Sequence, residues 1–181
     1  MASFPEILLE SKNKTRVLLF TAEPSVAKLI VQVLNFAGKE FDYFLSSGNF
    51  KNERKDFILV ETSNGLEASE LHPNIAFLST EISAENLLLV AKNLTPGGIL
   101  IYPVSDEKVL DESANFFRKL PYSASNCYSK DGIFYLNSDM GEIPLPVLKE
   151  DIVKDLEGLK TLCQQMGVLE EEFYEALLEF A

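Results

Sequence analysis

Short apolar runs that alternate with longer amphipathic segments constrain the fold of this sequence most. The first run, Arg16-Val17-Leu18-Leu19-Phe20, is apolar after its first residue and is typical of a strand buried on both faces. Pro24 then suits the first turn of a helix. Apolar residues follow at helical spacing until Gly38 ends the segment. A strand, a tight turn and a helix in this order predict the beginning of a βαβ unit.

The same alternation continues to the end of the chain. Further strands are predicted at 41–45, 57–60, 75–78 and 99–102, and helices at 4–11, 84–94, 106–119, 151–166 and 169–180. Two short runs, 127–129 and 133–136, flank Lys130-Asp131-Gly132 and predict a hairpin. We therefore expect one α/β domain over residues 1–181: a mostly parallel sheet with helices on both faces and a small antiparallel addition after residue 120.

The charge of the chain excludes several classes of partner. Its 181 residues include 28 acidic and 16 basic ones, for a formal net charge of -12. The averaged field repels phosphate backbones and anionic lipid, so we expect no nucleic acid and no membrane as partners. Lys51, Arg54 and Lys55 lie among asparagine and acidic residues, which is typical of a solvated loop. The sequence shows neither signal-peptide features nor a long apolar run, so we expect a cytoplasmic protein.

The cysteines and the histidine do not indicate a metal centre or a disulfide framework. Cys127 and Cys163 lie in unrelated segments, and His72 is the only histidine in the sequence. Neither Cys-x-x-Cys spacing nor Cys/His clustering occurs, so we expect no zinc site and no disulfide. As the only histidine, His72 joins no His/Cys or Ser/His constellation of a known spacing, so we expect no catalytic role for it.

Polar residues follow several of the predicted strands. Parallel α/β sheets bind their ligands at the carboxyl ends of the strands, and in this sequence those ends fall at 21–25, 61–65 and 79–86. The polar side chains there that we expect to line a pocket are Thr21, Ser25, Glu61, Ser63 and Thr80.

A series of short motifs extends through nearly the whole chain in the order found in one known family. The motifs are Phe4-Pro5-Glu6-Ile7, Lys14-Thr15-Arg16-Val17, Leu34-Asn35-Phe36-Ala37-Gly38-Lys39, Asp42-Tyr43, Phe57-Ile58-Leu59-Val60-Glu61, Leu71-His72-Pro73-Asn74-Ile75-Ala76, Leu94-Thr95-Pro96-Gly97-Gly98, Ile143-Pro144-Leu145-Pro146-Val147 and Met166-Gly167-Val168. The chain resembles the central ATPase domain of the Mur ligases, most closely the branch that reattaches muropeptides to UDP-N-acetylmuramate. The resemblance covers one of the family's three domains; the UDP-sugar domain and the C-terminal domain have no counterpart here.

The resemblance places a degenerate phosphate-binding loop at Thr21-Ala22-Glu23-Pro24-Ser25. A P-loop uses glycines to wrap the phosphates, a lysine to neutralise them and a Ser or Thr hydroxyl to bind Mg²⁺. This stretch has neither glycine nor lysine, and Glu23 falls at about the family's lysine position. We therefore expect no ATP and no other cofactor. Glu23 and Pro24 also form an acidic helix start that needs no ligand, and Lys28 is expected at the surface.

Other family positions are also changed. Glu61 matches the magnesium-binding glutamate and is the only metal candidate, although we assign no metal. The family's Asp-His pair aligns near Glu85-Asn86, and its Gly-x-His-Asn turn aligns near Lys149-Glu150-Asp151-Ile152, so the resemblance implies that both catalytic histidines are lost. His72 fits a structural Leu-His-Pro stretch, and Gly97-Gly98 follow a helix and predict a turn. No catalytic residue is assigned.

Three functions are compatible with these features. The first, which we favour, is a non-catalytic pseudo-ligase that acts as a binding or regulatory module linked to peptidoglycan recycling, with a protein partner or a second copy of itself. The second is binding of a non-nucleotide small ligand at the strand ends. The third is an ATP-dependent amide ligase fragment that another chain completes. The last two helices also carry an acidic face, which is usually solvated but could guide a basic partner; its residues are Glu157, Glu170, Glu171, Glu172, Glu175 and Glu179.

Overall fold

A computed structural model describes residues 3–138, 141–145 and 150–179, and this part of the chain forms two β-sheets. The larger is seven-stranded with the order β3-β2-β4-β1-β5-β6-β7, and all neighbours are parallel except β2 and β3. Its strands are β1 (Thr15–Phe20), β2 (Asp42–Phe44), β3 (Phe50–Lys51), β4 (Phe57–Thr62), β5 (Ile75–Leu78), β6 (Ile99–Pro103) and β7 (Arg118–Tyr122). The smaller is antiparallel, with β8 (Cys127–Lys130), β9 (Ile133–Ser138) and β10 (Gly141–Leu145). The predicted α/β fold and its antiparallel addition are confirmed.

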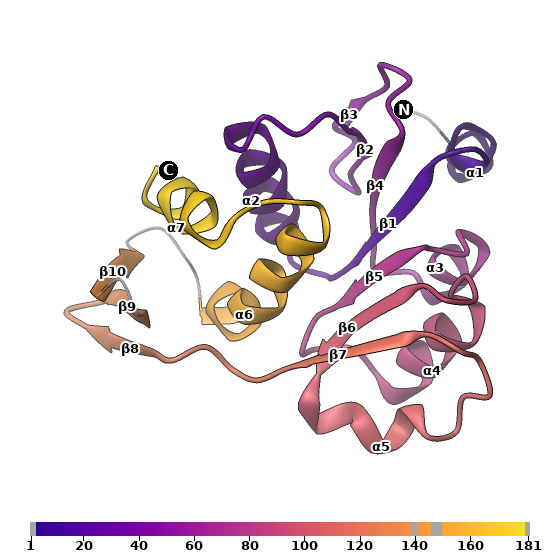
Figure 1. The fold of residues 1–181 in the computed structure, drawn as a ribbon. Helices are drawn as coiled ribbons and strands as arrows, with labels where there is room; N and C mark the ends of the chain where they lie inside the picture. The colour runs from indigo at the N-terminus through magenta and orange to yellow at the C-terminus, as the bar shows by residue number, and fades with distance from the viewer. Residues whose placement is uncertain (1–2, 139–140, 146–149, 180–181) are drawn as a thin grey trace.

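Helices cover both faces of the larger sheet (Figure 1). One face carries α1 (Phe4–Ser11), α3 (Gly65–Glu70), α4 (Ala84–Asn93) and α5 (Glu107–Leu110), and the other carries α2 (Pro24–Phe36), α6 (Glu150–Gln165) and α7 (Glu170–Leu178). Alternate residues of β1 supply the two cores: Leu19 packs with the α2 side, and Leu18 with the α4 side. Both are fully buried, and burial of each such side chain stabilises the fold by about 1.5–3 kcal/mol.

Local sequence signals explain where several helices begin. The Ser83 hydroxyl accepts a hydrogen bond from the Asn86 amide at 3.3 Å, so α4 starts at the predicted cap. The short helix α3, which the sequence pattern did not reveal, is capped by Asn64, whose side-chain oxygen accepts from the Leu66 amide at 3.0 Å. In the predicted hairpin, Asp131 and Gly132 both have positive φ, as a two-residue turn between antiparallel strands requires.

The helix predicted over 106–119 is wrong for most of its length. A 3-10 turn (Val104–Asp106) and the single turn of α5 are followed by extended chain and then by β7, which pairs with β6. The Asn115 side-chain amide explains the difference, because it donates to the carbonyl oxygens of Ala91 and Leu94 at 2.9 and 2.8 Å. These bonds fasten the segment to the end of α4, and the Arg118 amide then donates to the Gly98 carbonyl at 2.8 Å. Tertiary pairing therefore overrides the local helical pattern.

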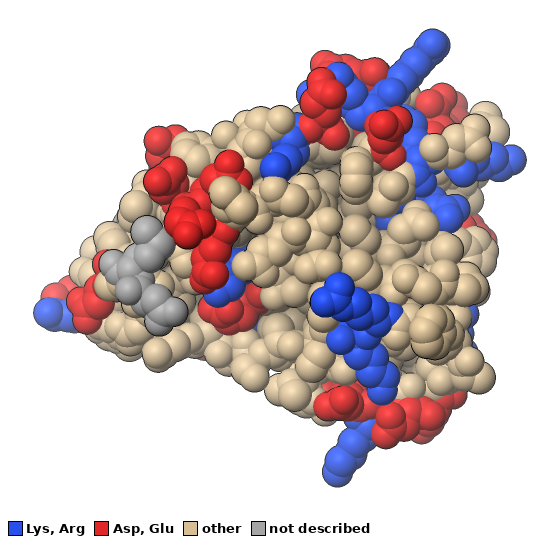
Figure 2. All heavy atoms as spheres, viewed as in Figure 1, with Lys and Arg blue, Asp and Glu red and all other residues tan. Residues whose placement is uncertain are grey.

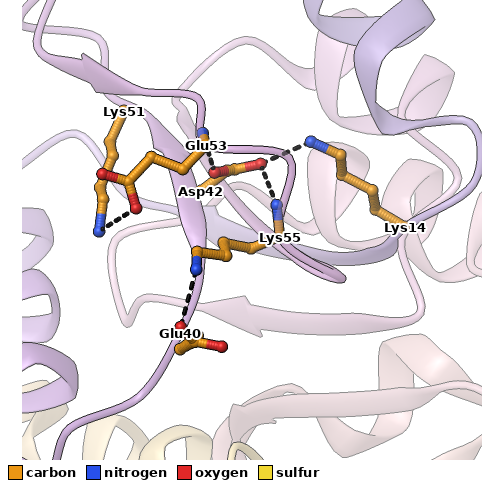
Figure 3. A network of polar contacts seen from close by, with 6 residues as sticks. All are labelled: Lys14, Glu40, Asp42, Lys51, Glu53 and Lys55. Carbon is orange, nitrogen blue, oxygen red and sulfur yellow. Dashed lines mark hydrogen bonds and ion pairs between the residues drawn. The ribbon is translucent and has the colours of Figure 1, made fainter.

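A buried carboxylate organises the amino-terminal end of the sheet (Figure 3). Asp42 begins β2, is fully buried, and accepts hydrogen bonds from the Lys14 ammonium at 2.5 Å and from the amides of Glu53 and Lys55 at 2.7 and 3.0 Å. Burial alone would raise the pKa of Asp42, but the Lys14 ammonium and the two amides lower it overall. Lys55 also pairs with Glu40 at 2.7 Å. Lys51, which was expected in a loop, ends strand β3 and pairs with Glu53 at 3.1 Å, and the loop that follows it is held by the acidic partners of Lys55 and by Asp42.

Acidic side chains are concentrated on one part of the surface. In Figure 2 they gather over α7, whereas acidic and basic side chains are mixed at the end of the molecule where α1 and β3 lie. On the acidic face, Glu170 is paired with Lys160 at 3.0 Å, while Glu171 and Glu175 are exposed. None of the helices in the described ranges is both long and apolar enough to span a membrane.

Candidate functional site

The carboxyl ends of β1, β4 and β5 meet around a cavity of about 200 Å³. Six of the nine described residues that line it are polar: Thr21, Ser63, Ser79, Glu81, Ser83 and Asn86. Thr21 and Ser79 are each only 4% exposed. The structure therefore brings together Thr21 and Ser63, as predicted, from segments about forty residues apart in the sequence.

The loop from Thr21 to Ser25 closes on itself rather than forming an open ring of amide groups. The Thr21 hydroxyl accepts a hydrogen bond from the Glu23 amide at 3.1 Å. The Glu23 carboxylate accepts from the Ser25 amide at 3.1 Å and from the Ser25 hydroxyl. The positive end of the α2 dipole thus already faces a carboxylate that belongs to the chain. Pro24, the first residue of α2, has no amide hydrogen to offer.

Glu61, at the end of β4, is buried beside this loop. It is 5% exposed, and its Oε2 accepts a hydrogen bond from the Ser46 amide at 3.1 Å. Burial raises the pKa of Glu61, the Ser46 bonds lower it, and the negative charge of Glu23 raises it again, with an upward net shift. Two acidic side chains therefore lie near each other at the place where the resemblance expects a lysine and a magnesium-binding glutamate.

The remaining predicted pocket residues lie elsewhere. Ser25 contacts Glu23, and Thr80 is exposed, with its amide donating to Oδ1 of Asp155 at 2.9 Å. Lys28 is exposed on α2, as expected. No group of three or more His, Cys, Asp or Glu residues in the described ranges is arranged to hold a metal ion.

A buried polar cluster next to the site was missed by the sequence analysis. Asp155 on α6 is 3% exposed, and its Oδ1 lies 2.8 Å from the Tyr122 hydroxyl, which is also 2.9 Å from the Leu78 carbonyl oxygen. Burial raises the pKa of Asp155 above its usual range, more than the hydrogen bonds from Tyr122 and Thr80 lower it. The helical spacing of Asp155 between the buried Ile152 and Leu159 was a usable signal, because it places this carboxylate on the core face of α6.

The positions aligned with the family's catalytic residues hold different side chains. Glu85 is exposed at the beginning of α4, and Asn86 lines the 200 Å³ cavity. Lys149 lies outside the described residues, and Glu150 begins α6. His72 is exposed, and its Nδ1 lies 3.0 Å from the Asn93 carbonyl oxygen, away from the cavity. Gly97 has a φ of 80° in the turn between α4 and β6, as predicted for Gly97-Gly98.

Comparison with known proteins identifies the fold. No family model and no curated protein matches the sequence. A solved UDP-N-acetylmuramate:L-alanyl-gamma-D-glutamyl-meso-diaminopimelate ligase from Neisseria meningitides is 12% identical, with a TM-score of 0.67 over 98% of this chain and 68% of that one. UDP-N-acetylmuramate-alanine ligase from Thermotoga maritima is 16% identical, with a TM-score of 0.63 over 98% and 47% of the two chains.

More distant ligases share the same architecture. An FPGS solved in complex with AMPPCP and folate is 10% identical, with a TM-score of 0.59 over 97% of this chain and 66% of that chain. The chain spans about half the length of several Mur ligases that it matches. It therefore has a Mur ligase central-domain-like fold, and the resemblance read from the sequence is confirmed at the level of fold.

Proposed function

We propose that this chain is a pseudo-ligase, a Mur-ligase-like domain that acts as a non-catalytic binding or regulatory module. The observation that carries the proposal is the Glu23 carboxylate at the N-terminus of α2, where it accepts hydrogen bonds from the amide and the hydroxyl of Ser25. In a P-loop, the amides at this helix end bind phosphate. Here the same end of the helix is satisfied by an anion from within the chain.

Electrostatics supports the loss of triphosphate binding. Two unit charges about 4 Å apart interact by ~4 kcal/mol at an effective dielectric constant of about 20. A glutamate in place of a lysine exchanges that attraction for a repulsion of similar size, and Glu61 adds a second negative side chain close by. A nucleotide would have to displace Glu23 from its cap and also overcome both charges.

The absence of catalytic histidines supports a non-enzymatic function. Glu85 and Asn86 stand at one of the two aligned positions, and the only histidine, His72, lies outside the cavity. The ligases with similar structures that act on UDP-N-acetylmuramate compounds suggest a place in peptidoglycan recycling. The module would act there through a protein partner or through a second copy of itself, and the acidic face over α7 is the surface that would attract a basic partner.

Thermal denaturation with and without Mg-ATP tests this proposal. A ligand at 100 times its dissociation constant adds ~2.7 kcal/mol, which corresponds to a rise in Tm of about 5–10 °C for a domain of this size. We expect no rise for the native chain. A clear rise would contradict the proposal, and ATP turnover that is abolished in Glu61→Ala but retained in Glu23→Ala would favour a ligase fragment completed by another chain.

A second candidate is the binding of a small neutral ligand in the 200 Å³ cavity. Thr21, Ser63, Ser79, Ser83 and Asn86 line it together with the acidic Glu81, which suits a polar molecule that both donates and accepts hydrogen bonds. A screen of small polyols and amides by NMR tests this alternative. Shifts confined to residues of this cavity would favour it, and their loss in Asn86→Leu would assign the site.

A further inference from the structure

A second and larger cavity, of about 350 Å³, lies where β2 and β4 end, with α1 and α3 beside it. Among the described residues it shares only Ser63 with the cavity described above. Its size falls within the range of about 300–1,000 Å³ that is typical of small-molecule sites. Neither the proposed loss of ATP binding nor the second candidate function uses this space.

The apolar side chains that line this cavity belong to one face of the large sheet. Phe44 and Val60 are direct partners in the parallel pairing of β2 with β4, so their side chains project from the same face. Both belong to the buried cluster on the α4 side, and Phe4 and Ile7 of α1 pack against that cluster. The two helical and the two strand residues therefore form one continuous apolar wall.

The aromatic ring in this wall is held in place. Phe44 is only 6% exposed and stacks on Phe50, with ring centroids 6.0 Å apart and ring planes 7° apart. Phe4 supplies a second ring to the lining. An aromatic ligand gains from contact with such rings in addition to the burial of its own apolar surface.

The same face also carries one carboxylate. Thr62 lies two residues after Val60 on β4, and alternation along the strand places both on the same face of the sheet. The Thr62 hydroxyl donates to Oε2 of Glu67 at 2.6 Å, which brings this carboxylate from α3 to the Thr62 end of the wall. Glu61 lies between Val60 and Thr62 in the sequence and so projects from the opposite face.

The polar group that suits Glu67 is a hydrogen-bond donor. A carboxylate accepts about four hydrogen bonds, and the Thr62 hydroxyl supplies one of them. No lysine, arginine or histidine is present among the described residues that line the cavity, so none of these competes with a ligand for the remaining positions. A ligand that only accepts hydrogen bonds would displace water from Glu67 without replacing its donors, which costs free energy.

We infer that this cavity binds an aromatic molecule that carries an N–H or O–H donor. The ring of the ligand packs against Phe4, Ile7 and Phe44, and its donor bonds to a free lone pair of the Glu67 carboxylate. Selection rests on the donor and on the ring, and a neutral molecule satisfies both.

Titration of the ¹⁵N-labelled chain with indole, followed by NMR, tests the inference. We expect saturable shifts of amides around this cavity, those of Phe44 and Thr62 among them. 1-Methylindole keeps the ring but has no N–H, so it should bind about tenfold more weakly, as is typical for the loss of a hydrogen bond to a charged acceptor. This comparison uses the native chain alone and does not depend on how any variant folds.

Two pairs of variants separate the donor from the ring. Glu67→Leu should abolish the preference for indole over 1-methylindole, whereas Glu70→Leu, on the exposed side of the same helix, removes the same charge and should preserve it. Phe4→Ala should weaken both ligands by roughly fivefold through lost apolar contact. Leu9→Ala is its matched control, because Leu9 is 65% exposed on the same helix and should leave both affinities unchanged.

Several results would overturn the inference. Absence of a saturable shift around the cavity would show that it does not take aromatic molecules, and equal affinity for the two indoles would show that no donor is recognised. A preference for indole that persists in Glu67→Leu would remove Glu67 from the site, and unchanged affinity in Phe4→Ala would remove α1. The Mg-ATP denaturation experiment reports on the α2 loop, so failure of either proposal can be distinguished from failure of the other.

Discussion

Asp42 and Glu61 are buried carboxylates at opposite ends of neighbouring strands, and their surroundings differ sharply. Asp42 lies where β2 begins and has a lysine and two amides as partners. Glu61 lies where β4 ends, with the Ser46 amide as a donor and a second acid, Glu23, nearby. The pKa of Asp42 is accordingly lowered, whereas burial raises the pKa of Glu61.

The difference shows that Asp42 stabilises the fold, whereas the buried charge of Glu61 destabilises it. Asp42 is neutralised within the chain and connects three segments, so it needs no ligand (Figure 3). Glu61 is not neutralised in this way, and burying an uncompensated charge lowers stability. Uncompensated charge at the carboxyl ends of strands is more typical of a binding site than of a structural core.

Removal of Asp42 should have the largest effect on stability. Asp42→Ala leaves the Lys14 ammonium, 11% exposed, and two amides without their acceptor. We expect a loss of about 3–5 kcal/mol in the free energy of unfolding, as is typical when one partner of a buried pair is deleted. Urea denaturation at neutral pH measures it. A loss below about 1 kcal/mol would mean that Asp42 is no more important than a surface ion pair.

Asp155 should show an intermediate effect that depends on its replacement. Asp155→Ala removes the acceptor of the Thr80 amide and the Tyr122 partner, so we expect a loss of about 1–3 kcal/mol. Asp155→Asn keeps an acceptor and adds a donor, much as a protonated acid does, so it should cost clearly less. Urea denaturation of both variants checks the order, and an asparagine variant as unstable as the alanine variant would show that the ionised form is required.

Replacement of Glu61 should raise stability at neutral pH, whereas replacement of Asp42 lowers it. Since its pKa is raised in the folded chain, the folded state binds a proton more tightly than the unfolded state, whose carboxyl has its ordinary value of 4.5. Stability is therefore lost as pH rises from about 4.5 through the folded pKa. Glu61→Gln should flatten this slope and raise the free energy of unfolding at neutral pH. Equilibrium unfolding of both chains from pH 4 to pH 8 measures the slope and the stability at neutral pH. An unchanged slope in Glu61→Gln would contradict the raised pKa of Glu61.

The contrast between these sites also shows what local sequence could predict. Strand β1, helix α2 and its cap at Glu23 follow from signals within a few residues, and they were predicted correctly. The strand β7 could not be recognised, because the Asn115 side chain fixes the chain ahead of it through carbonyl groups of Ala91 and Leu94. The extended conformation of this segment is therefore determined by hydrogen-bond partners more than twenty residues away in the sequence.

The site was predictable to a similar extent. Thr21 and Ser63 line the cavity because each follows a strand of the parallel sheet, which is a local signal. Ser25 and Thr80 meet the same criterion but their hydrogen bonds are made with Glu23 and Asp155. The cavity of about 350 Å³ beside α1 was not foreseen, since Phe4 and Glu67 line it only when α1 packs on the same face of the sheet as α3.

Breaking the exposed ion pair of Glu40 and Lys55 should have the smallest effect on stability, and it serves as a comparison for Asp42→Ala. Both side chains belong to the network in Figure 3, but Glu40 is 77% exposed. Hydration competes with an exposed pair, and salt screens it. We expect Glu40→Gln to leave the urea midpoint unchanged at moderate ionic strength, although the pair bonds at 2.7 Å. A loss as large as that of Asp42→Ala would show that the loop itself, and not the buried carboxylate, holds this end of the sheet together.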